Sequence, residues 1–132
     1  MAYLFETAGG PPDLERHTFL AWDPEREYVL RGGALEIWRG GERVSSERVR
    51  DPLGPLRAVL ASEGAAYLPG SEGFNGGLVG YVAYEFKNHL ERLPDTVRDD
   101  LGVPELRLGF VRHVVSWDRR AGMVRLDRKS VV

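Results

Sequence analysis

The side chains that most often bind metals or act as nucleophiles are scattered in this sequence. Its three histidines, His17, His89 and His113, lie far apart. A histidine metal site usually contains a close pair, such as two histidines one helical turn apart, and the sequence has no such pair. Cysteine is absent, which excludes disulfides, thiolate metal sites and thiol nucleophiles. We therefore expect each histidine to be a structural or surface residue, and we expect no metal site.

The hydroxyl and carboxyl groups also lack a catalytic arrangement. None of the serines lies in the Gly-x-Ser-x-Gly pattern that exposes a nucleophile at a strand-to-helix turn. Asp99 and Asp100 are adjacent, but neighbouring acids in a polar stretch are more typical of a solvated surface than of an acid–base pair. On its chemistry alone, the sequence contains no recognisable catalytic residues.

The most unusual segment is a glycine cluster, Gly73–Gly80. A phosphate-binding loop would end in Gly-Lys-Ser/Thr and would open a helix, whereas this cluster leads into a sequence typical of a strand. Asn75 and Gly76 accept positive φ, and Gly80 lets another backbone or a bulky side chain approach a buried strand. We expect the cluster to shape the backbone and not to bind phosphate.

Turn residues divide the first third of the chain into short strands. Gly32-Gly33 and Gly40-Gly41 can each form a tight hairpin turn, because both glycines of such a pair accept positive φ. The strands are expected at Tyr3–Thr7, His17–Asp23, Glu27–Arg31, Ala34–Arg39 and Glu42–Glu47. This pattern predicts an antiparallel meander.

One main helix follows the meander. Asp51 can cap it, Pro52 suits its first turn, and Gly64 marks its end. Its apolar positions, Leu53, Leu56, Val59 and Leu60, recur at helical spacing. Beyond it we expect a loop at Tyr67–Gly76, a buried strand at Leu78–Tyr84, short helical turns at Asn88–Leu93 and Asp95–Leu101, and strands at Leu106–Trp117 and Met123–Asp127.

These elements define an α+β fold with antiparallel β-sheets (a meander plus a C-terminal hairpin), one main helix and short helical turns. The length suits a single domain over residues 1–132.

A net charge of −2, with arginines dispersed among acids, disfavours nucleic acid as a partner. No apolar run approaches the roughly 20 residues that cross a bilayer, and Met1–Gly10 lacks the basic region and apolar run typical of a secretory signal. We expect a soluble, cytoplasmic protein with no membrane partner.

The segment Phe74–Glu85 resembles the F-x-G-G-x-x-G-Y-x-x-Y-[D/E] signature found near the N-terminus of component I of anthranilate synthases and aminodeoxychorismate synthases. Glu91–Pro94 is similar to the E-x-L-P of this family, Asp99–Pro104 to its D-D-x-G-x-P, and Val114–Asp118 to a strand that ends in an Asp-containing turn. The signature positions, for which we expect a structural role, are Phe74, Gly76, Gly77, Gly80, Tyr81, Tyr84 and Glu85.

Two further motifs near the start complete the resemblance, which runs from about Leu4 to Leu126. Leu4-Phe5-Glu6-Thr7 resembles the family's L-L-E-S, and Arg16–Leu20 resembles its R-Y-S-F-I. In anthranilate synthases L-L-E-S belongs to the tryptophan feedback pocket, and in some aminodeoxychorismate synthases the equivalent pocket holds tryptophan structurally. Leu4, Phe5, Glu6 and Thr7 are therefore candidate contacts to L-tryptophan. The alternative is that Glu6 and Thr7 simply end an edge strand.

The resemblance also implies what the complete enzymes need. They convert chorismate to anthranilate or 4-amino-4-deoxychorismate with Mg²⁺ and with ammonia from a glutamine amidotransferase subunit. The chorismate and metal sites lie in a C-terminal domain that this sequence lacks. We therefore expect a non-catalytic half of an α/β sandwich, inactive alone and without its own cofactor, which docks on the chorismate-binding domain through an exposed apolar face.

The choice between the two enzymes rests on few residues. Tyr84-Glu85-Phe86-Lys87 resembles the Tyr-Glu-Leu-Lys of aminodeoxychorismate synthases, whereas anthranilate synthases often have Tyr-Asp at this point. Together with Phe5 and Thr7, which depart from L-L-E-S, this favours the para-aminobenzoate and folate pathway. The alternatives are the N-terminal domain of anthranilate synthase component I, in tryptophan biosynthesis, and a stand-alone amino-acid-binding module.

Overall fold

The computed structural model describes residues 1–7, 10–11, 16–63, 73–94 and 98–128. Its strands form a four-stranded sheet with the order β1-β2-β8-β9 and a five-stranded sheet with the order β5-β4-β3-β7-β6. All the paired strands are antiparallel, which confirms the predicted fold class. The strands are β1 (Ala2–Glu6), β2 (His17–Trp22), β3 (Arg26–Arg31), β4 (Ala34–Arg39), β5 (Glu42–Arg48), β6 (Gly77–Val82), β7 (Leu106–Val111), β8 (His113–Asp118) and β9 (Met123–Arg128).

The predicted meander is confirmed in β3, β4 and β5. Gly32 and Gly33 have φ values of 52° and 76°, and Gly40 and Gly41 have values of 57° and 85°. Both hairpins therefore turn where paired glycines supply positive φ, as their sequence indicates.

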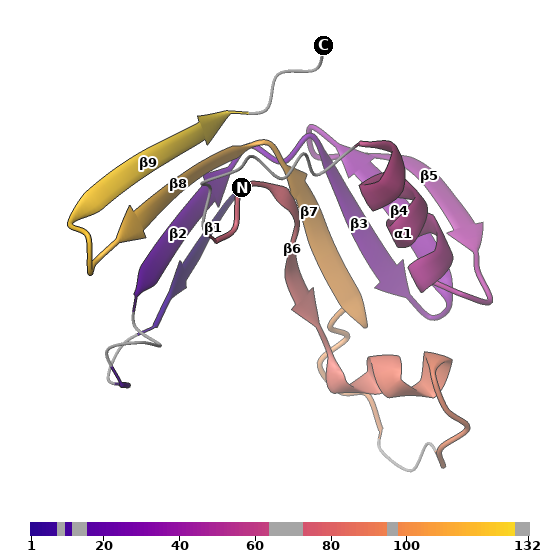
Figure 1. The fold of residues 1–132 in the computed structure, drawn as a ribbon. Coiled ribbons are helices and arrows are strands. Elements are labelled where there is room, and N and C mark those ends of the chain that lie inside the picture. The colour runs from indigo at the N-terminus through magenta and orange to yellow at the C-terminus, as the bar shows by residue number, and fades with distance from the viewer. Residues whose placement is uncertain (8–9, 12–15, 64–72, 95–97, 129–132) are drawn as a thin grey trace.

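The chain crosses between the two sheets at two places, which lie together at the top of Figure 1. One crossing joins β2 to β3, and the other joins β7 to β8 at Arg112. The prediction of a single strand at Leu106–Trp117 is therefore wrong, because β7 and β8 belong to different sheets. Local residue preference could not locate the break, since the run on both sides of Arg112 is equally rich in strand-forming residues.

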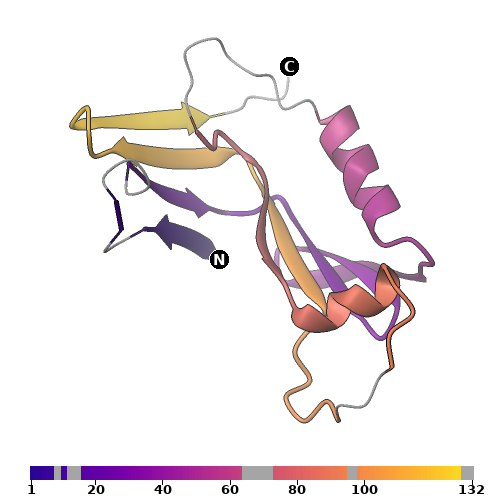
Figure 2. The ribbon, with the colours of Figure 1, turned by 60° about the horizontal axis from the view of Figure 1, so that its bottom comes forward.

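The main core lies between the five-stranded sheet and helix α1 (Leu53–Ser62), which lies on one side of this sheet (Figures 1 and 2). The predicted cap is present, because the backbone N–H of Leu53 donates to Oδ1 of Asp51 at 3.0 Å. Leu56 packs among buried side chains that include Tyr28 and Leu30. Burying each such side chain contributes about 1.5–3 kcal/mol. The predicted helix end at Gly64 lies outside the described residues.

A second core joins the two sheets. Val79 and Val111 of the five-stranded sheet pack with Val114 of the four-stranded sheet, and Tyr3 lies against this cluster. A Cβ at Gly109 would overlap the hydroxyl group of Tyr3, so this glycine makes room for the ring. Tyr3 therefore fixes one face of β1 against the five-stranded sheet.

The structure corrects the predictions around residue 80. The strand ends at Val82 and lies at the sheet edge, and Tyr84 begins a 3₁₀ helix, η1 (Tyr84–His89). The strand predicted at Leu78–Tyr84 is thus too long, and it is only half buried. The helical turn predicted at Asn88–Leu93 begins earlier. Parts of two predicted elements lie outside the described part of the chain. They are residues 67–72 of the loop and residues 95–97 of the second helical turn.

Candidate functional site

The motif Leu4–Thr7 lies at the free edge of the four-stranded sheet. Side chains alternate along a strand, so Leu4 and Glu6 share one face, and Phe5 shares the other face with Tyr3. The face of Tyr3 packs toward the five-stranded sheet. We call it the inner face and the face of Leu4 the outer face. A ligand on the outer face would therefore meet Leu4 and Glu6 but not Phe5.

Arg119, in the turn between β8 and β9, binds the end of this motif. Its Nη2 donates to Oε1 of Glu6 at 2.6 Å and to Oγ1 of Thr18 at 2.9 Å. Its Nη1 donates to the carbonyl oxygen of Thr7 at 3.2 Å, and its guanidinium carbon lies 5.6 Å from the centre of the Trp117 ring. Its Nε is buried and has no hydrogen-bond partner among the described residues. No local sequence pattern distinguishes Arg119 from the other arginines, so its place beside Leu4–Thr7 could not be predicted.

Asp118 holds the turn that carries Arg119. Its Oδ2 accepts hydrogen bonds from Nε and Nη2 of Arg16 at 3.0 and 2.8 Å. Its Oδ1 accepts from the backbone N–H groups of Arg120 and Ala121, both at 3.0 Å. The Arg16 hydrogen bond, followed by that from Ala121, holds the pKa of Asp118 well below its usual range. Two motifs of the sequence analysis, Arg16–Leu20 and Val114–Asp118, thus meet on adjacent strands.

A cavity of about 340 Å³ lies beside this carboxylate. Arg16, His17, Ser116 and Asp118 line it, together with residues of β9. It does not include Leu4–Thr7, so the structure brings the tryptophan motif to Arg119 but not into this cavity.

The outer face carries apolar side chains in register across the sheet, all exposed except the half-buried Val115. Leu4 pairs with Leu20, Leu20 with Val115, and Val115 with Leu126. In the adjacent row Trp117 pairs with Val124. Leu4, Val124 and Leu126 are 64–69% exposed. We call Leu4, Leu20, Val115, Trp117, Val124 and Leu126 the outer-face patch; it is an exposed apolar face of the kind that the family resemblance predicts.

The signature residues Phe74–Glu85 are divided between the core and the surface. Phe74 meets the ring of Phe19 edge-on, with 6.2 Å between ring centres. A Cβ at Gly80 would overlap the carbonyl oxygen of Arg107 on β7. Tyr84 is largely exposed, and Nζ of Lys87 lies 4.4 Å from the centre of its ring. The remaining positions are Gly76 and Gly77, which have positive φ before and at the start of β6, and Tyr81 and Glu85, which lie at the surface.

Tyr84 and Glu85 also line an open depression of about 740 Å³ between η1, the β3–β4 turn and residues 98–105. Its acids hold the backbone in place: Oδ1 of Asp99 accepts hydrogen bonds from the N–H groups of Leu101 and Gly102. Glu105 binds His89 and accepts from the N–H of Gly32 at 2.8 Å. In the described part of the chain, no group of three or more His, Asp or Glu side chains could hold a metal ion.

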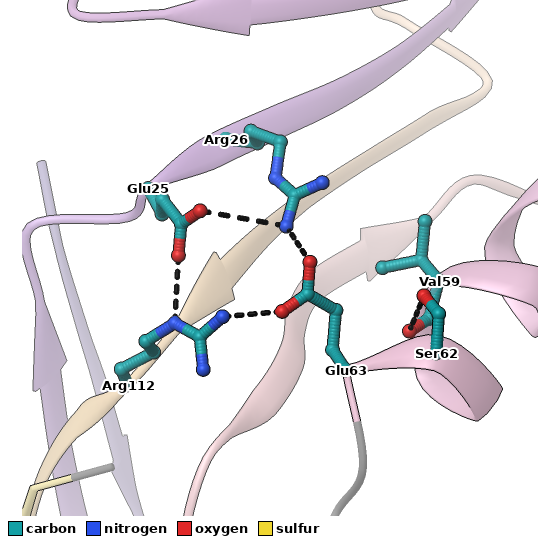
Figure 3. A network of polar contacts seen from close by, with 6 residues as sticks. All are labelled: Glu25, Arg26, Val59, Ser62, Glu63 and Arg112. Atoms are coloured by element: carbon teal, nitrogen blue, oxygen red, sulfur yellow. Dashed lines mark hydrogen bonds and ion pairs between the residues drawn. The ribbon is translucent and has the colours of Figure 1, made fainter. Parts of the chain in front are cut away.

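Four charged residues form a closed ring where the chain crosses between the sheets (Figure 3). Glu63, just beyond α1, binds Arg26 through one carboxylate oxygen and Arg112 through the other. Glu25 completes the ring, because its carboxylate accepts from Nε of Arg112 at 2.7 Å and lies 3.5 Å from Nη2 of Arg26. Both guanidinium groups lie 5.2–5.4 Å from the centre of the Phe110 ring. The ring ties the helix to both crossings, which is a structural role.

Comparison with known proteins gives relatives for nearly the whole chain, although no family model matches it. Anthranilate synthase component 1 of Mycolicibacterium smegmatis is 30% identical over 129 residues, which cover 98% of this chain and 24% of that protein. The Pseudomonas putida protein of the same name is 32% identical over 123 residues, 92% of this chain and 25% of the relative. Anthranilate synthase component I from Streptococcus pneumoniae shares the fold, with a TM-score of 0.65 and 16% identity over 97% of this chain and 26% of that one.

The paired sheets and the sequence similarity define the chain as a homologue of the N-terminal region of the component I family. Within that family, the similarity is to the N-terminal quarter of anthranilate synthase component I. The chain spans about a quarter of the length of these relatives. These relatives are anthranilate synthases. They therefore favour the N-terminal domain of anthranilate synthase component I over the aminodeoxychorismate synthase that Tyr84–Lys87 suggested. None of the described helices is long and apolar enough to cross a membrane.

Proposed function

We propose that this chain is the N-terminal, non-catalytic part of an anthranilate synthase and serves as a docking scaffold for the rest of component I. The rest, called here the remaining segment, corresponds to the three quarters of the relatives that the chain does not cover. The outer-face patch is the single observation that carries the proposal. Contiguous exposed apolar surface of this kind marks interaction sites in water-soluble domains.

The energetics of the patch suit a permanent junction. Burying the exposed part of several Leu, Val and Trp side chains contributes about 25 cal/mol for each Å² removed from water. The patch lies on four paired strands, so its backbone is already ordered and docking has only the side-chain rotamers left to fix. Leu4 and Leu126 occupy opposite edges of the sheet, which makes the whole width available to a partner.

The chemistry of the complete enzyme belongs to the remaining segment and its partners under this proposal. Chorismate, Mg²⁺ and an ammonia-supplying glutamine amidotransferase subunit would be bound outside this chain. The names of the relatives support anthranilate as the product of the complete enzyme. The segment Tyr84–Lys87 and the departures from L-L-E-S at Phe5 and Thr7 favoured aminodeoxychorismate; the proposal follows the relatives.

The proposal includes an L-tryptophan contact at Leu4, Glu6 and Thr7 of the predicted motif; Phe5, which lies on the inner face, is not part of it. The pair Glu6–Arg119 supports it, because a carboxylate beside a guanidinium complements the ammonium and carboxylate of an amino acid. Trp117, under the guanidinium, adds an apolar surface for the indole. The rest of such a pocket would come from the remaining segment, so the chain alone should bind weakly.

Assembly of the chain with the remaining segment encoded in its source organism tests the proposal. The chain should restore anthranilate formation from chorismate, and Leu126→Glu in the outer-face patch should lower assembly at least 10-fold. Val44→Glu on β5, which is 55% exposed and lies outside the patch, is the matched control. Equal assembly by both variants, or the absence of assembly with the wild-type chain, would overturn the docking role.

Isothermal titration of the assembled enzyme with L-tryptophan tests the proposed tryptophan contact. Unchanged affinity in both Glu6→Gln and Thr7→Ala would contradict this contact.

A further inference from the structure

We infer that the free edge of β6 accepts a strand from the remaining segment, so that the five-stranded sheet continues across the junction. The inference rests on the proposed function for the identity of the partner. It depends on a different part of the molecule, since β6 and the outer-face patch belong to different sheets.

The two edges of the five-stranded sheet differ in how they are protected. β5, at one edge, carries four charged residues in seven, and its register with β4 shifts between Ile37 and Trp38. Charges and bulges of this kind prevent an edge strand from pairing with another chain. β6, at the other edge, has the sequence Gly-Leu-Val-Gly-Tyr-Val, without a charge or a proline. Its composition is typical of a strand with a neighbour on both sides.

The hydrogen-bonding groups of β6 are oriented for a second partner. The N–H of Ala83 donates to the carbonyl oxygen of Glu105 at 2.9 Å, next to the pair Val82–Leu106. Val82 is therefore at a position of the antiparallel ladder whose own N–H and C=O point away from β7. The same orientation recurs at every second residue, so the backbone groups of Leu78 and Gly80 also point outward. No strand in the described part of the chain pairs with this edge.

The side chains beside the edge are apolar and exposed. Tyr81, Val82 and Tyr84 are 40%, 55% and 79% exposed, whereas Val79, two positions before Tyr81, is buried. An added strand would cover side chains on both faces of the sheet, because residues 81 and 82 point to opposite faces. An uncovered edge of this composition would promote aggregation, so its presence indicates that the native assembly covers it.

The remaining segment is the occupant that fits these observations. In the relatives, the region similar to this chain is followed or accompanied by about three times as much polypeptide, which is ample to supply a strand. The partner strand should itself be apolar and free of proline at its paired positions, since the edge offers no charge to complement.

Hydrogen exchange provides the test. Amide exchange of the 132-residue chain should be compared by NMR alone and assembled with the remaining segment from its source organism. We expect the amides of Leu78, Gly80 and Val82 to exchange at least 10-fold more slowly in the assembly, whereas the outward amides of β5 should not change. Val82→Lys should weaken assembly at least 10-fold, and Val44→Lys should not; both valines are 55% exposed and lie on edge strands of the same sheet.

The possible outcomes separate this inference from the proposed function. Assembly that leaves exchange at Leu78, Gly80 and Val82 unchanged would overturn the strand addition while the docking role stands. Failure to assemble would overturn both. Protection that appears in the chain alone and grows with its concentration would show that a second copy occupies the edge, which also overturns the inference.

Discussion

The carboxylate of Glu6 lies 2.6 Å from the guanidinium group of Arg119, although 113 positions separate the two residues in the sequence. The contact joins the first strand of the chain to the turn between its last two strands. The same guanidinium holds the hydroxyl of Thr18 and the carbonyl oxygen of Thr7. β1 is paired with β2 along its length, and Arg119 adds a side-chain tie from the end of the motif, at Glu6 and Thr7, to the turn between β8 and β9.

Arg119→Ala should affect ligand binding much more than stability. Its ion pair with Glu6 is exposed, and pairs of this kind contribute about 0–1 kcal/mol to the free energy of unfolding. If Glu6 and Arg119 hold the charged ends of L-tryptophan, its affinity for the assembled enzyme should fall at least 10-fold. Isothermal titration and urea denaturation measure the two effects. Arg57→Ala, on the exposed side of α1, is the control; the proposed contact fails if both variants bind tryptophan equally.

Gly80→Ala should destabilise the chain because β7 leaves no space for a Cβ at this position. The added carbon would overlap the carbonyl oxygen of Arg107, which belongs to the backbone and cannot rotate away. We expect a loss of about 2–4 kcal/mol in the free energy of unfolding, measured by urea denaturation.

Gly122→Ala is the matched control for Gly80→Ala. Gly122 also has positive φ, 64°, but a Cβ there would meet no atom within 4 Å. It should lose only about 1 kcal/mol from backbone strain. An equal loss in the two variants would mean that the contact with Arg107 carries no cost.

Local chemistry allowed most of the meander and the helix start to be predicted. Gly32-Gly33 determines its own turn, and Asp51 caps the helix from two residues away. The break at Arg112 and the edge position of β6 could not be predicted in this way. Each depends on which strand lies alongside, and that is decided by residues far away in the sequence.

The same distinction applies to the candidate site. The motif Leu4–Thr7 marked one half of the Glu6–Arg119 contact, because the family resemblance is carried by consecutive residues. Its other half is an arginine in a turn, and only the pairing of β1, β2 and β8 brings it there. The charged ring was missed for the same reason, since Glu63 and Arg112 are 49 positions apart.

Asp118 should make the stability of the chain depend on pH in the acid range. Hydrogen bonds from Arg16 and Ala121 lower its pKa in the folded state, so the unfolded state binds the proton more tightly. The stabilisation from the ionised carboxylate is therefore complete above the unfolded pKa of about 3.9 and is lost as the pH falls toward the lower folded value. Asp118→Asn lacks this contribution.

The stabilisation from the ionised Asp118 carboxylate is measured as the difference in unfolding free energy between wild type and Asp118→Asn. The other carboxylates titrate in both proteins, so their contributions cancel in this difference. The difference should be constant from about pH 5 to 8 and should shrink below about pH 4. A difference that grows as the pH falls would contradict the assigned direction of the shift.

Glu63→Gln should weaken the junction between helix α1 and the two crossings. The hydrogen bond from Arg26, against the opposing effect of burial, lowers the pKa of Glu63, so this residue is ionised at neutral pH. Its replacement leaves Arg26 and Arg112 close together with only Glu25 to balance two positive charges. We expect a loss of about 1–2 kcal/mol in the free energy of unfolding, less than for a fully buried pair because these groups retain some contact with water.

A double-mutant cycle tests whether this loss comes from the ring. Arg112→Met removes one of the two positive charges and keeps a side chain that can pack on Phe110. The double variant Glu63→Gln, Arg112→Met should lose at least 0.5 kcal/mol less unfolding free energy than the two single variants lose together, because the two residues are in contact. Glu47→Gln on the exposed edge strand β5 should leave stability within about 0.5 kcal/mol of wild type. Strict additivity of Glu63→Gln and Arg112→Met would show that the ring does not act as a unit.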